Sequence, residues 1–416
     1  MKYARELQIQ IDDVYACPGN CAGCILVADE RRTRTPDMSE RLLRLSMNRL
    51  DAYIPTLDNL EYINLTYGIG DHLRMDQDYL KLLHSLGADL LEKHGYDDPK
   101  NAVFFTTSLI GKADILLPRL EELAHHDRRV QFYPIAVLDP AKLYNKNFGA
   151  VYEGNILRAK ELFGKVDLAI NLSAEAIERI TPQELHDFAA ENEFDEVTIN
   201  WTPTKANIAH TAPCIDDLAD WLIAFNRAVV SAERIGSSFA PVLRRSIDAV
   251  MCQADDDRPT LQQAVNDVLP ETIRKSIEID HLGNLLPKLE AVGDITHGDR
   301  FGLPTLGNIN QGEIADLLGT AMSPLKARVM GIHSRSPACV DCPHLAVCAV
   351  TGFHVQTHIL GPRAGRETGC PHVAAKLIDH FMDEAVIADE LRQEQAFIAP
   401  AARRQTSRGN SEWMTA

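Results

Sequence analysis

The cysteines are the residues of this chain whose types and spacing point most clearly to chemistry. The chain has nine of them in 416 residues. Three, Cys17, Cys21 and Cys24, lie within eight residues of one another, while Cys214 and Cys252 stand alone. Thiolates are soft ligands that suit zinc or iron–sulfur clusters. Because the chain is long and begins without an export signal, we predict that the group of three binds a metal rather than forming disulfides, and that the isolated two are small buried hydrophobic residues.

A second group of cysteines lies far downstream. Cys339, Cys342 and Cys348 have the spacing C-x2-C-x5-C, and Cys370 follows them. Four thiolates can complete the coordination of one iron–sulfur cluster. They also suit a structural zinc, held by all four cysteines or by three of them and a histidine. The candidate histidines are His344, His354 and His372.

These ligands need a scaffold, and the pattern of the chain predicts an α/β fold with parallel strands. From residue 7 to about residue 235, short β-type runs alternate with longer amphipathic segments such as 39–54, which is typical of βα units. Thr181 to Glu184 has the pattern of a capping box with proline at the first helical position. The predicted fold class is a partial (β/α)6 TIM-like barrel with a smaller carboxyl-terminal extension. The six predicted strands are 7–13, 61–67, 102–107, 130–138, 166–172 and 196–202.

Glycine and polar residues follow several of these strands. The second strand leads into Gly68-Ile-Gly70-Asp71, the third ends in Thr106, Thr107 and Ser108, and the fourth runs into Asp139. Glycine permits close backbone approach, and a carboxylate such as that of Asp71 can accept hydrogen bonds from an ammonium group. Each segment alone is also explained as a plain turn or strand cap. Because parallel barrels carry their active sites at the carboxyl ends of their strands, we expect one site there, beside the first cysteine group.

The CxxxCxxC loop, together with these strand endings in their order, resembles the radical S-adenosylmethionine (radical SAM) superfamily. The resemblance implies that Cys17, Cys21 and Cys24 hold a 4Fe-4S cluster whose fourth iron binds S-adenosylmethionine (AdoMet). On spacing alone, a zinc knuckle or three unrelated thiols remain the alternatives. The implied AdoMet-binding residues are Gly68, Gly70, Asp71, Thr107, Ser108 and Asp139.

The chain departs from the superfamily pattern at three places. Gly23 stands where an aromatic residue usually contacts adenine, and Val137 stands where a serine is common. The segment 144–153 lacks the arginine often found there. Lys146 or Asn147 is the predicted replacement as partner of the AdoMet carboxylate, with a solvated loop lysine as the alternative.

The downstream region resembles the SPASM/twitch extension of radical SAM enzymes. A full SPASM domain carries two auxiliary clusters, but Lys288 and Gly352 stand where further cysteines are expected. The resemblance therefore implies one auxiliary cluster, held by the second cysteine group, and two 4Fe-4S clusters in the whole chain. The expected division is a radical SAM core at 1–235, a connector at 236–275, a SPASM/twitch-like domain at 276–385, and a helix end with a mobile tail at 386–416.

The resemblance implies an enzyme. An electron from a flavodoxin- or ferredoxin-type donor would cleave AdoMet to methionine and a 5′-deoxyadenosyl radical, which abstracts hydrogen from the substrate. The first hypothesis for the substrate is a peptide or protein side chain that is oxidised or cross-linked. The first predicted strand begins near residue 7, which leaves no room before it for a peptide-recognition domain. Any leader peptide is therefore expected to need a separate binding protein. The alternatives are a small molecule of cofactor or natural-product biosynthesis, and a non-catalytic iron–sulfur or zinc scaffold or sensor.

Composition excludes other classes of function. The formal net charge of −17 argues against nucleic acid, whose binding proteins usually carry a basic excess. No apolar stretch is long enough to suggest a membrane span or a signal peptide. The expected localisation is cytoplasmic.

Overall fold

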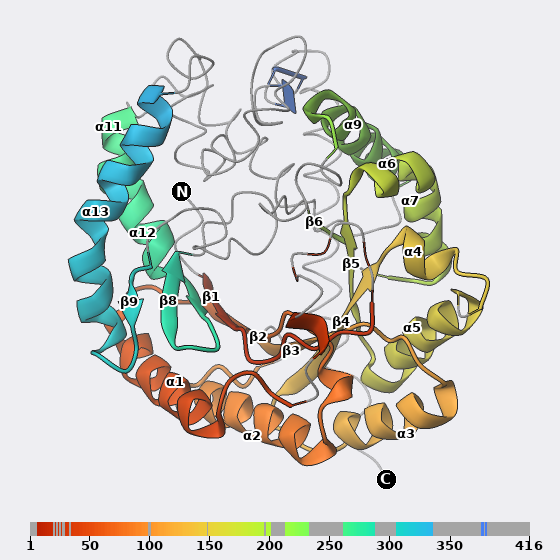
Figure 1. Cartoon of the computed structure of the whole chain (residues 1–416), viewed down its shortest axis with the longest axis horizontal. Helices are drawn as coiled ribbons and strands as arrows, with labels where there is room; N and C mark the ends of the chain where they lie inside the picture. The colour runs from red at the N-terminus through yellow and green to blue at the C-terminus, as the bar shows by residue number, and fades with distance from the viewer. Residues whose placement is uncertain are drawn as a thin grey trace.

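A single sheet organises the described part of the chain, as the computed structural model shows. The sheet has nine strands in the order β6-β5-β4-β3-β2-β1-β7-β8-β9. It curls so that the helices lie on its outer side (Figure 1). The structure describes residues 6–19, 21, 24, 26, 30–32, 35–98, 101–147, 149–194, 197–200, 213–232, 261–287, 305–335, 376, 377, 379 and 380.

The six predicted strands are confirmed, and each is parallel to its neighbour. The helices that follow them lie outside the sheet, which gives the partial TIM-like barrel expected from the sequence (Figure 1). The strands are β1 Glu6–Ile11, β2 Tyr62–Tyr67, β3 Ala102–Thr107, β4 Gln131–Leu138, β5 Asp167–Asn171 and β6 Val197–Asn200. The helices around them are α1 Glu40–Tyr53, α2 Gln77–Lys93, α3 Ala113–Ala124, α4 Pro140–Leu143, α5 Gly149–Phe163, α6 Ala174–Arg179, α7 Pro182–Glu191 and α9 Ile215–Ala232.

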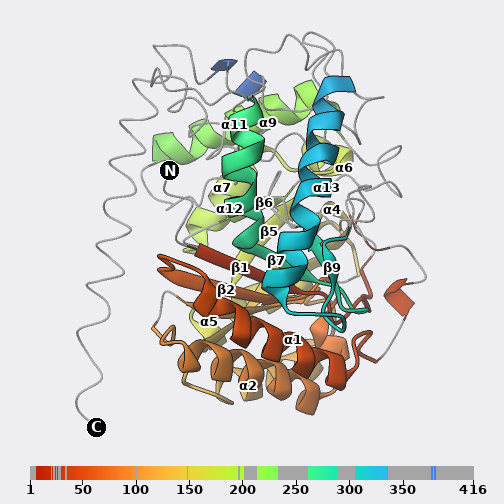
Figure 2. The ribbon, with the colours of Figure 1, turned by 90° about the vertical axis from the view of Figure 1, so that its left-hand side faces the viewer.

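Three further strands extend the sheet beyond β1 and were not predicted. β7, Ser276–Ile279, pairs parallel with β1, and β8, Asn284–Pro287, and β9, Gly307–Asn308, continue antiparallel. Residues expected in the carboxyl-terminal extension therefore join the same sheet as the barrel strands. The helices near them are α11 Leu261–Gln263, α12 Leu269–Arg274 and α13 Ile314–Arg335, of which α13 contacts α1, α12 and β9 (Figure 2).

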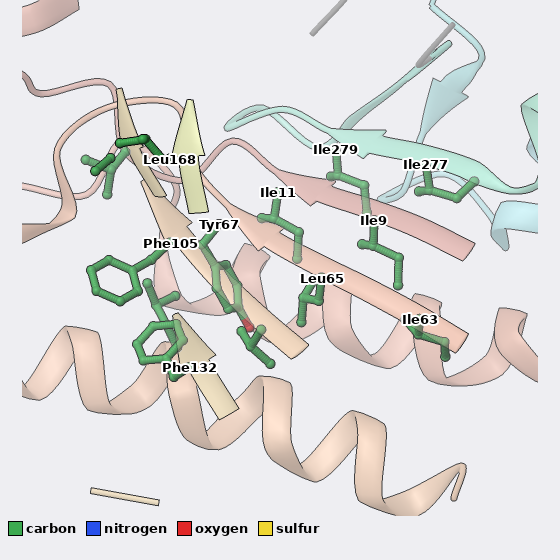
Figure 3. Packing of buried hydrophobic residues seen from close by; sticks show 14 of the residues in the cluster. Ile9, Ile11, Ile63, Leu65, Tyr67, Phe105, Phe132, Leu168, Ile277 and Ile279 are labelled. Atoms are coloured by element: carbon green, nitrogen blue, oxygen red, sulfur yellow. The ribbon is translucent and has the colours of Figure 1, made fainter. Parts of the chain in front are cut away.

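A row of apolar side chains joins the sheet to its helices. Ile277, Ile9, Leu65, Val103 and Phe132 are neighbours across five strands in the pairing register, and all five are buried. Figure 3 shows this face of the sheet above the helices. Because side chains alternate along a strand, the residues between them point to the inner side of the barrel. The outer face thus forms the hydrophobic core, and the inner side and the strand ends are left for a site.

Helix α7 begins with the predicted capping box. The Thr181 hydroxyl accepts a hydrogen bond from the Glu184 amide at 3.1 Å, and the Glu184 carboxylate accepts one from the Thr181 amide at 2.8 Å. Replacing Thr181 with alanine is expected to lower the free energy of unfolding by about 1 kcal/mol, because the amide loses its partner. Urea denaturation measures this change. Thr181→Ser keeps the hydroxyl and is the control; an equal loss in both variants would contradict the cap.

The described helices were also compared with the length and hydrophobicity that a membrane crossing requires. No described helix meets both requirements.

Candidate functional site

The first cysteine group lies in the loop that follows β1, at the carboxyl edge of the sheet. Gly19 separates Cys17 from Cys21, and a Cβ atom built on Gly19 would lie 3.3 Å from the Cys17 Sγ and 3.6 Å from the Cys21 Sγ. The missing side chain of Gly19 therefore leaves room beside two sulfurs. The Gly19 amide donates a hydrogen bond to the Cys17 Sγ at 3.3 Å, and the Leu26 amide donates one to the Cys24 Sγ at 3.4 Å. Such bonds to sulfur are a feature of iron–sulfur ligation.

The three thiols lie in a poorly solvated environment. Burial raises the pKa of Cys17 to about 11 and that of Cys21 to about 12, and it also raises the pKa of Cys24. A thiol that stays protonated at neutral pH is a poor nucleophile. A bound metal ion or cluster supplies the positive charge that deprotonates a coordinating thiol. The donor set therefore fits metal ligation better than a free reactive cysteine.

A buried lysine, Lys142, lies beside these thiols. Its Cε is 3.8 Å from the same Gly19 Cβ position, and its ammonium donates a hydrogen bond to the Val137 carbonyl at 2.9 Å and lies 5.2 Å from the centre of the Tyr152 ring. Burial alone would lower the pKa of Lys142, but its interactions with the ionisable groups around it, Cys21 first among them, raise it overall. A cation is thus held next to the sulfurs.

Lys142 was not among the residues predicted for this site. Lys146 and Asn147, the predicted partners of the AdoMet carboxylate, are both exposed. Lys142, four residues before Lys146, is buried. Asp139 is buried beside the cysteine loop, where its charge contributes to raising the pKa of Cys21, and it caps α4 by accepting from the Ala141 amide at 2.9 Å.

The Gly68–Asp71 segment runs directly alongside the residues between β1 and the cysteines. The amides of Gly68, Gly70 and Asp71 donate to the carbonyls of residues 11, 14 and 16 at 3.0, 2.7 and 2.6 Å. A Cβ on Gly70 would lie 2.6 to 2.7 Å from backbone atoms of residues 14–16, closer than real contacts allow. Only glycine therefore permits this approach at Gly70.

The carboxylate of Asp71 joins the ends of β2 and β3. It accepts hydrogen bonds from the Thr107 hydroxyl at 2.9 Å and from the Ser108 hydroxyl at 2.6 Å, and its side chain is buried. The Asp71 charge also contributes to raising the pKa of Cys17. Asp71, predicted from the end of β2, thus contacts Thr107 and Ser108, predicted from the end of β3. All three lie near the cysteine loop.

Several predicted site residues lie outside the described part of the chain. These are the second cysteine group, Cys339, Cys342, Cys348 and Cys370, whose assignment stays a prediction. Gly23, where the chain departs from the superfamily pattern, also lies outside it. Among the described residues, no three His, Cys, Asp or Glu side chains meet closely enough to hold one metal ion.

Sequence reasoning missed two buried side chains of the site besides Lys142. They are Asp13, which follows β1, and His72, which follows Asp71 and forms an ion pair with Asp13. The only sequence signals were an acidic residue at a strand end and a histidine next to the glycine segment.

Comparison with known proteins finds solved structures with a similar fold. No protein-family model matches the sequence, and no curated protein matches it. The solved structure of native anSMEcpe with bound AdoMet and Cp18Cys peptide matches with a TM-score of 0.59 and 12% identity, over 94% of this chain and 99% of that chain. The shared fold is a partial TIM-like barrel. The structure of native anSMEcpe with bound AdoMet matches with a TM-score of 0.58 and 12% sequence identity, over 94% of this chain and 100% of that chain.

Proposed function

We propose that this chain is a radical SAM enzyme. The observation that carries the proposal is the contact of Asp71 with Thr107 and Ser108, on a segment hydrogen-bonded to the residues that lead into Cys17. The barrel shared with anSMEcpe, whose structures contain AdoMet, supports the same reading. At 12% identity this likeness concerns the fold, so the activity rests on the site residues themselves.

The residues of the site would divide the work of binding. Cys17, Cys21 and Cys24 would hold a 4Fe-4S cluster by three of its irons. Asp71 would accept hydrogen bonds from the AdoMet ammonium, beside the close backbone at Gly70. When bound, a reduced cluster with AdoMet supplies the cleavage that gives methionine and a 5′-deoxyadenosyl radical. The buried position of Asp71 reduces the screening of its charge by water, which strengthens its contact with an ammonium group.

Lys142 would contribute a fixed positive charge to the same site. Its hydrogen bond to Val137 and its position over Tyr152 hold the ammonium in place beside Cys21. A buried cation there offsets the negative charge of thiolate ligands. We assign to Lys142, rather than Lys146, the role of partner of the AdoMet carboxylate, which the missing arginine leaves open.

For the substrate we propose a peptide or protein side chain, oxidised or cross-linked after hydrogen abstraction. The structure of anSMEcpe with a bound Cp18Cys peptide supports this class over a small molecule. A flavodoxin- or ferredoxin-type protein would donate the electron, and the localisation would be cytoplasmic. We also propose the division into a core at 1–235, a connector at 236–275, a SPASM/twitch-like domain at 276–385 and a tail at 386–416. The auxiliary cluster would be bound by Cys339, Cys342, Cys348 and Cys370.

Anaerobic reconstitution tests the proposal. Protein reconstituted with iron and sulfide, then supplied with dithionite and AdoMet, is expected to form 5′-deoxyadenosine, which chromatography with mass spectrometry detects. Metal analysis is expected to find about eight irons per chain for two clusters, whereas about four irons with one zinc would assign the second cysteine group to zinc. Protein that carries at least four irons and forms no 5′-deoxyadenosine would contradict the enzyme and leave a scaffold or sensor.

A further inference from the structure

A buried ion pair lies next to Asp71, and neither of its members is used in the proposed function. The Asp13 carboxylate and the His72 ring are both completely buried. The His72 Nε2 is 3.0 Å from the Asp13 Oδ1, and the Tyr79 hydroxyl donates to the Asp13 Oδ2 at 2.8 Å. Buried charges are costly unless they are paired, so a pair at this place needs a reason.

The contacts of His72 determine its protonation. Its Nε2 faces the Asp13 carboxylate, and its Nδ1 faces the Thr106 carbonyl at 3.0 Å. Both of these neighbours are acceptors, and the Thr106 hydroxyl, 3.3 Å from Nδ1, donates its proton to the Gly70 carbonyl instead. A neutral imidazole has only one N–H to donate. With both nitrogens protonated, both contacts are hydrogen bonds. Burial alone would lower the pKa of His72, but the Asp13 charge and these bonds raise it overall.

The imidazolium connects the glycine segment to two strands. Through Asp13 it is bonded to the end of β1, and through Thr106 to the end of β3. The Thr106 hydroxyl donates in turn to the Gly70 carbonyl at 2.6 Å. Asp71 therefore lies between Gly70 and His72, and this network holds both of them in place. The charge of Asp71 also favours the cationic form of the His72 ring.

We propose that the Asp13–His72 ion pair is a positioning device that fixes Asp71 for the ammonium group of AdoMet. This inference rests on the proposed function, because it assigns a partner to a residue of that site. Hydrogen bonds between charged groups are stronger than those between neutral groups, so the loss of the pair is large enough to move Asp71.

His72→Gln tests the inference in the reconstituted holoenzyme. The KM for AdoMet in 5′-deoxyadenosine formation is expected to rise roughly tenfold or more, while kcat at saturating AdoMet changes much less. His84→Gln is the matched control. His84 is buried, stacks on Phe132 and bonds to the Val130 carbonyl, all away from the glycine segment. This control is expected to keep the wild-type KM even where it loses stability.

Two further variants keep the result interpretable. Tyr79→Phe removes only one hydrogen bond to Asp13, and we expect a smaller rise in KM than for His72→Gln, so it serves if His72→Gln fails to fold. Asp71→Asn tests the site itself. If Asp71→Asn leaves the KM unchanged, the AdoMet role of Asp71 in the proposed function is wrong. If Asp71→Asn raises the KM but His72→Gln and Tyr79→Phe behave like His84→Gln, only the inference fails.

The pH profile separates positioning by charge from a purely structural role. Because the pKa of His72 is raised above its ordinary value, the imidazolium is fully present below the ordinary pKa of imidazole and is lost as the pH rises through the raised pKa. The groups that face it are Asp13 and Asp71, with Tyr79 and Tyr67 near Asp13. The wild-type KM is expected to rise relative to that of His72→Gln on the alkaline side. Parallel profiles in the two proteins would overturn the charge-based role.

Discussion

Replacement of Cys21 with alanine is expected to remove one cluster and to abolish 5′-deoxyadenosine formation. Cys21 shares the space beside Gly19 with Cys17 and with the Lys142 side chain. Loss of a residue that only supports a metal ligand typically costs roughly 10- to 100-fold in metal affinity or activity, and loss of the ligand itself should exceed this. Iron analysis is expected to find about four irons fewer per chain, with a matching loss of visible absorbance.

Cys214→Ala is the control for this prediction. Cys214 is only partly buried, precedes α9 and belongs to neither cysteine group. The variant is expected to keep the wild-type iron content and activity, which shows that the loss of a thiol alone is not the cause. Full iron content in Cys21→Ala, or equal losses in both variants, would refute the assignment of Cys21 as a cluster ligand.

The elements that the sequence could predict are those whose signal is local. β3 has the same bounds in the prediction and in the structure, 102–107, because the high β-propensity of its valine, phenylalanines and threonines can be read from six residues. The capping box at Thr181 is equally local. β7 has only four residues, all buried, and its pairing with β1 joins residues more than 260 positions apart. Neither its length nor its partner leaves a periodic signal in the sequence.

The candidate site shows the same division. Asp71, Thr107 and Ser108 could be predicted because parallel strands bring their carboxyl ends to one edge. The burial of Lys142 beside the thiols could not be predicted, because α4 has only four residues and so short a helix has no periodicity that tells which of its side chains turn inward. The pairing of His72 with Asp13 spans 59 residues and depends on how a ring is oriented after β2, which composition and spacing do not determine.

The two glycines of the GIGD segment were predicted for a reason that the structure changes. The sequence suggested that bare backbone is needed for close approach to a cofactor. In the structure, a Cβ on Gly68 would collide with the Thr106 side chain, and one on Gly70 would collide with the chain between β1 and Cys17. The glycines are thus required by the fold of the site before any cofactor binds. This difference leads to a prediction for the protein without its cluster.

Replacement of Gly70 with alanine is expected to disrupt the site even in the apoprotein. The added Cβ would lie 2.6 Å from the Ala16 carbonyl oxygen and 2.7 Å from atoms of Tyr15 and Val14. These are backbone atoms, so no side-chain rotation relieves the collision, and the bonds from Gly70 to Val14 and from Asp71 to Ala16 must lengthen. Overpacking typically costs about 1–3 kcal/mol. Denaturation of the apoprotein measures this loss, and the reconstituted variant is expected to bind AdoMet at least tenfold more weakly, on the order of the same free energy.

Gly154→Ala supplies the matched control with the opposite sign. Gly154 lies within α5, and nothing approaches within 4 Å of the position its Cβ would take. Alanine is favoured over glycine in a helix interior by roughly 1 kcal/mol, so this variant is expected to be slightly more stable than the wild type and to bind AdoMet unchanged. If Gly70→Ala instead kept both the wild-type stability and the wild-type affinity, the close approach of Gly70 to residues 14–16 would be wrong, and with it the placement of Asp71 beside the cysteine loop.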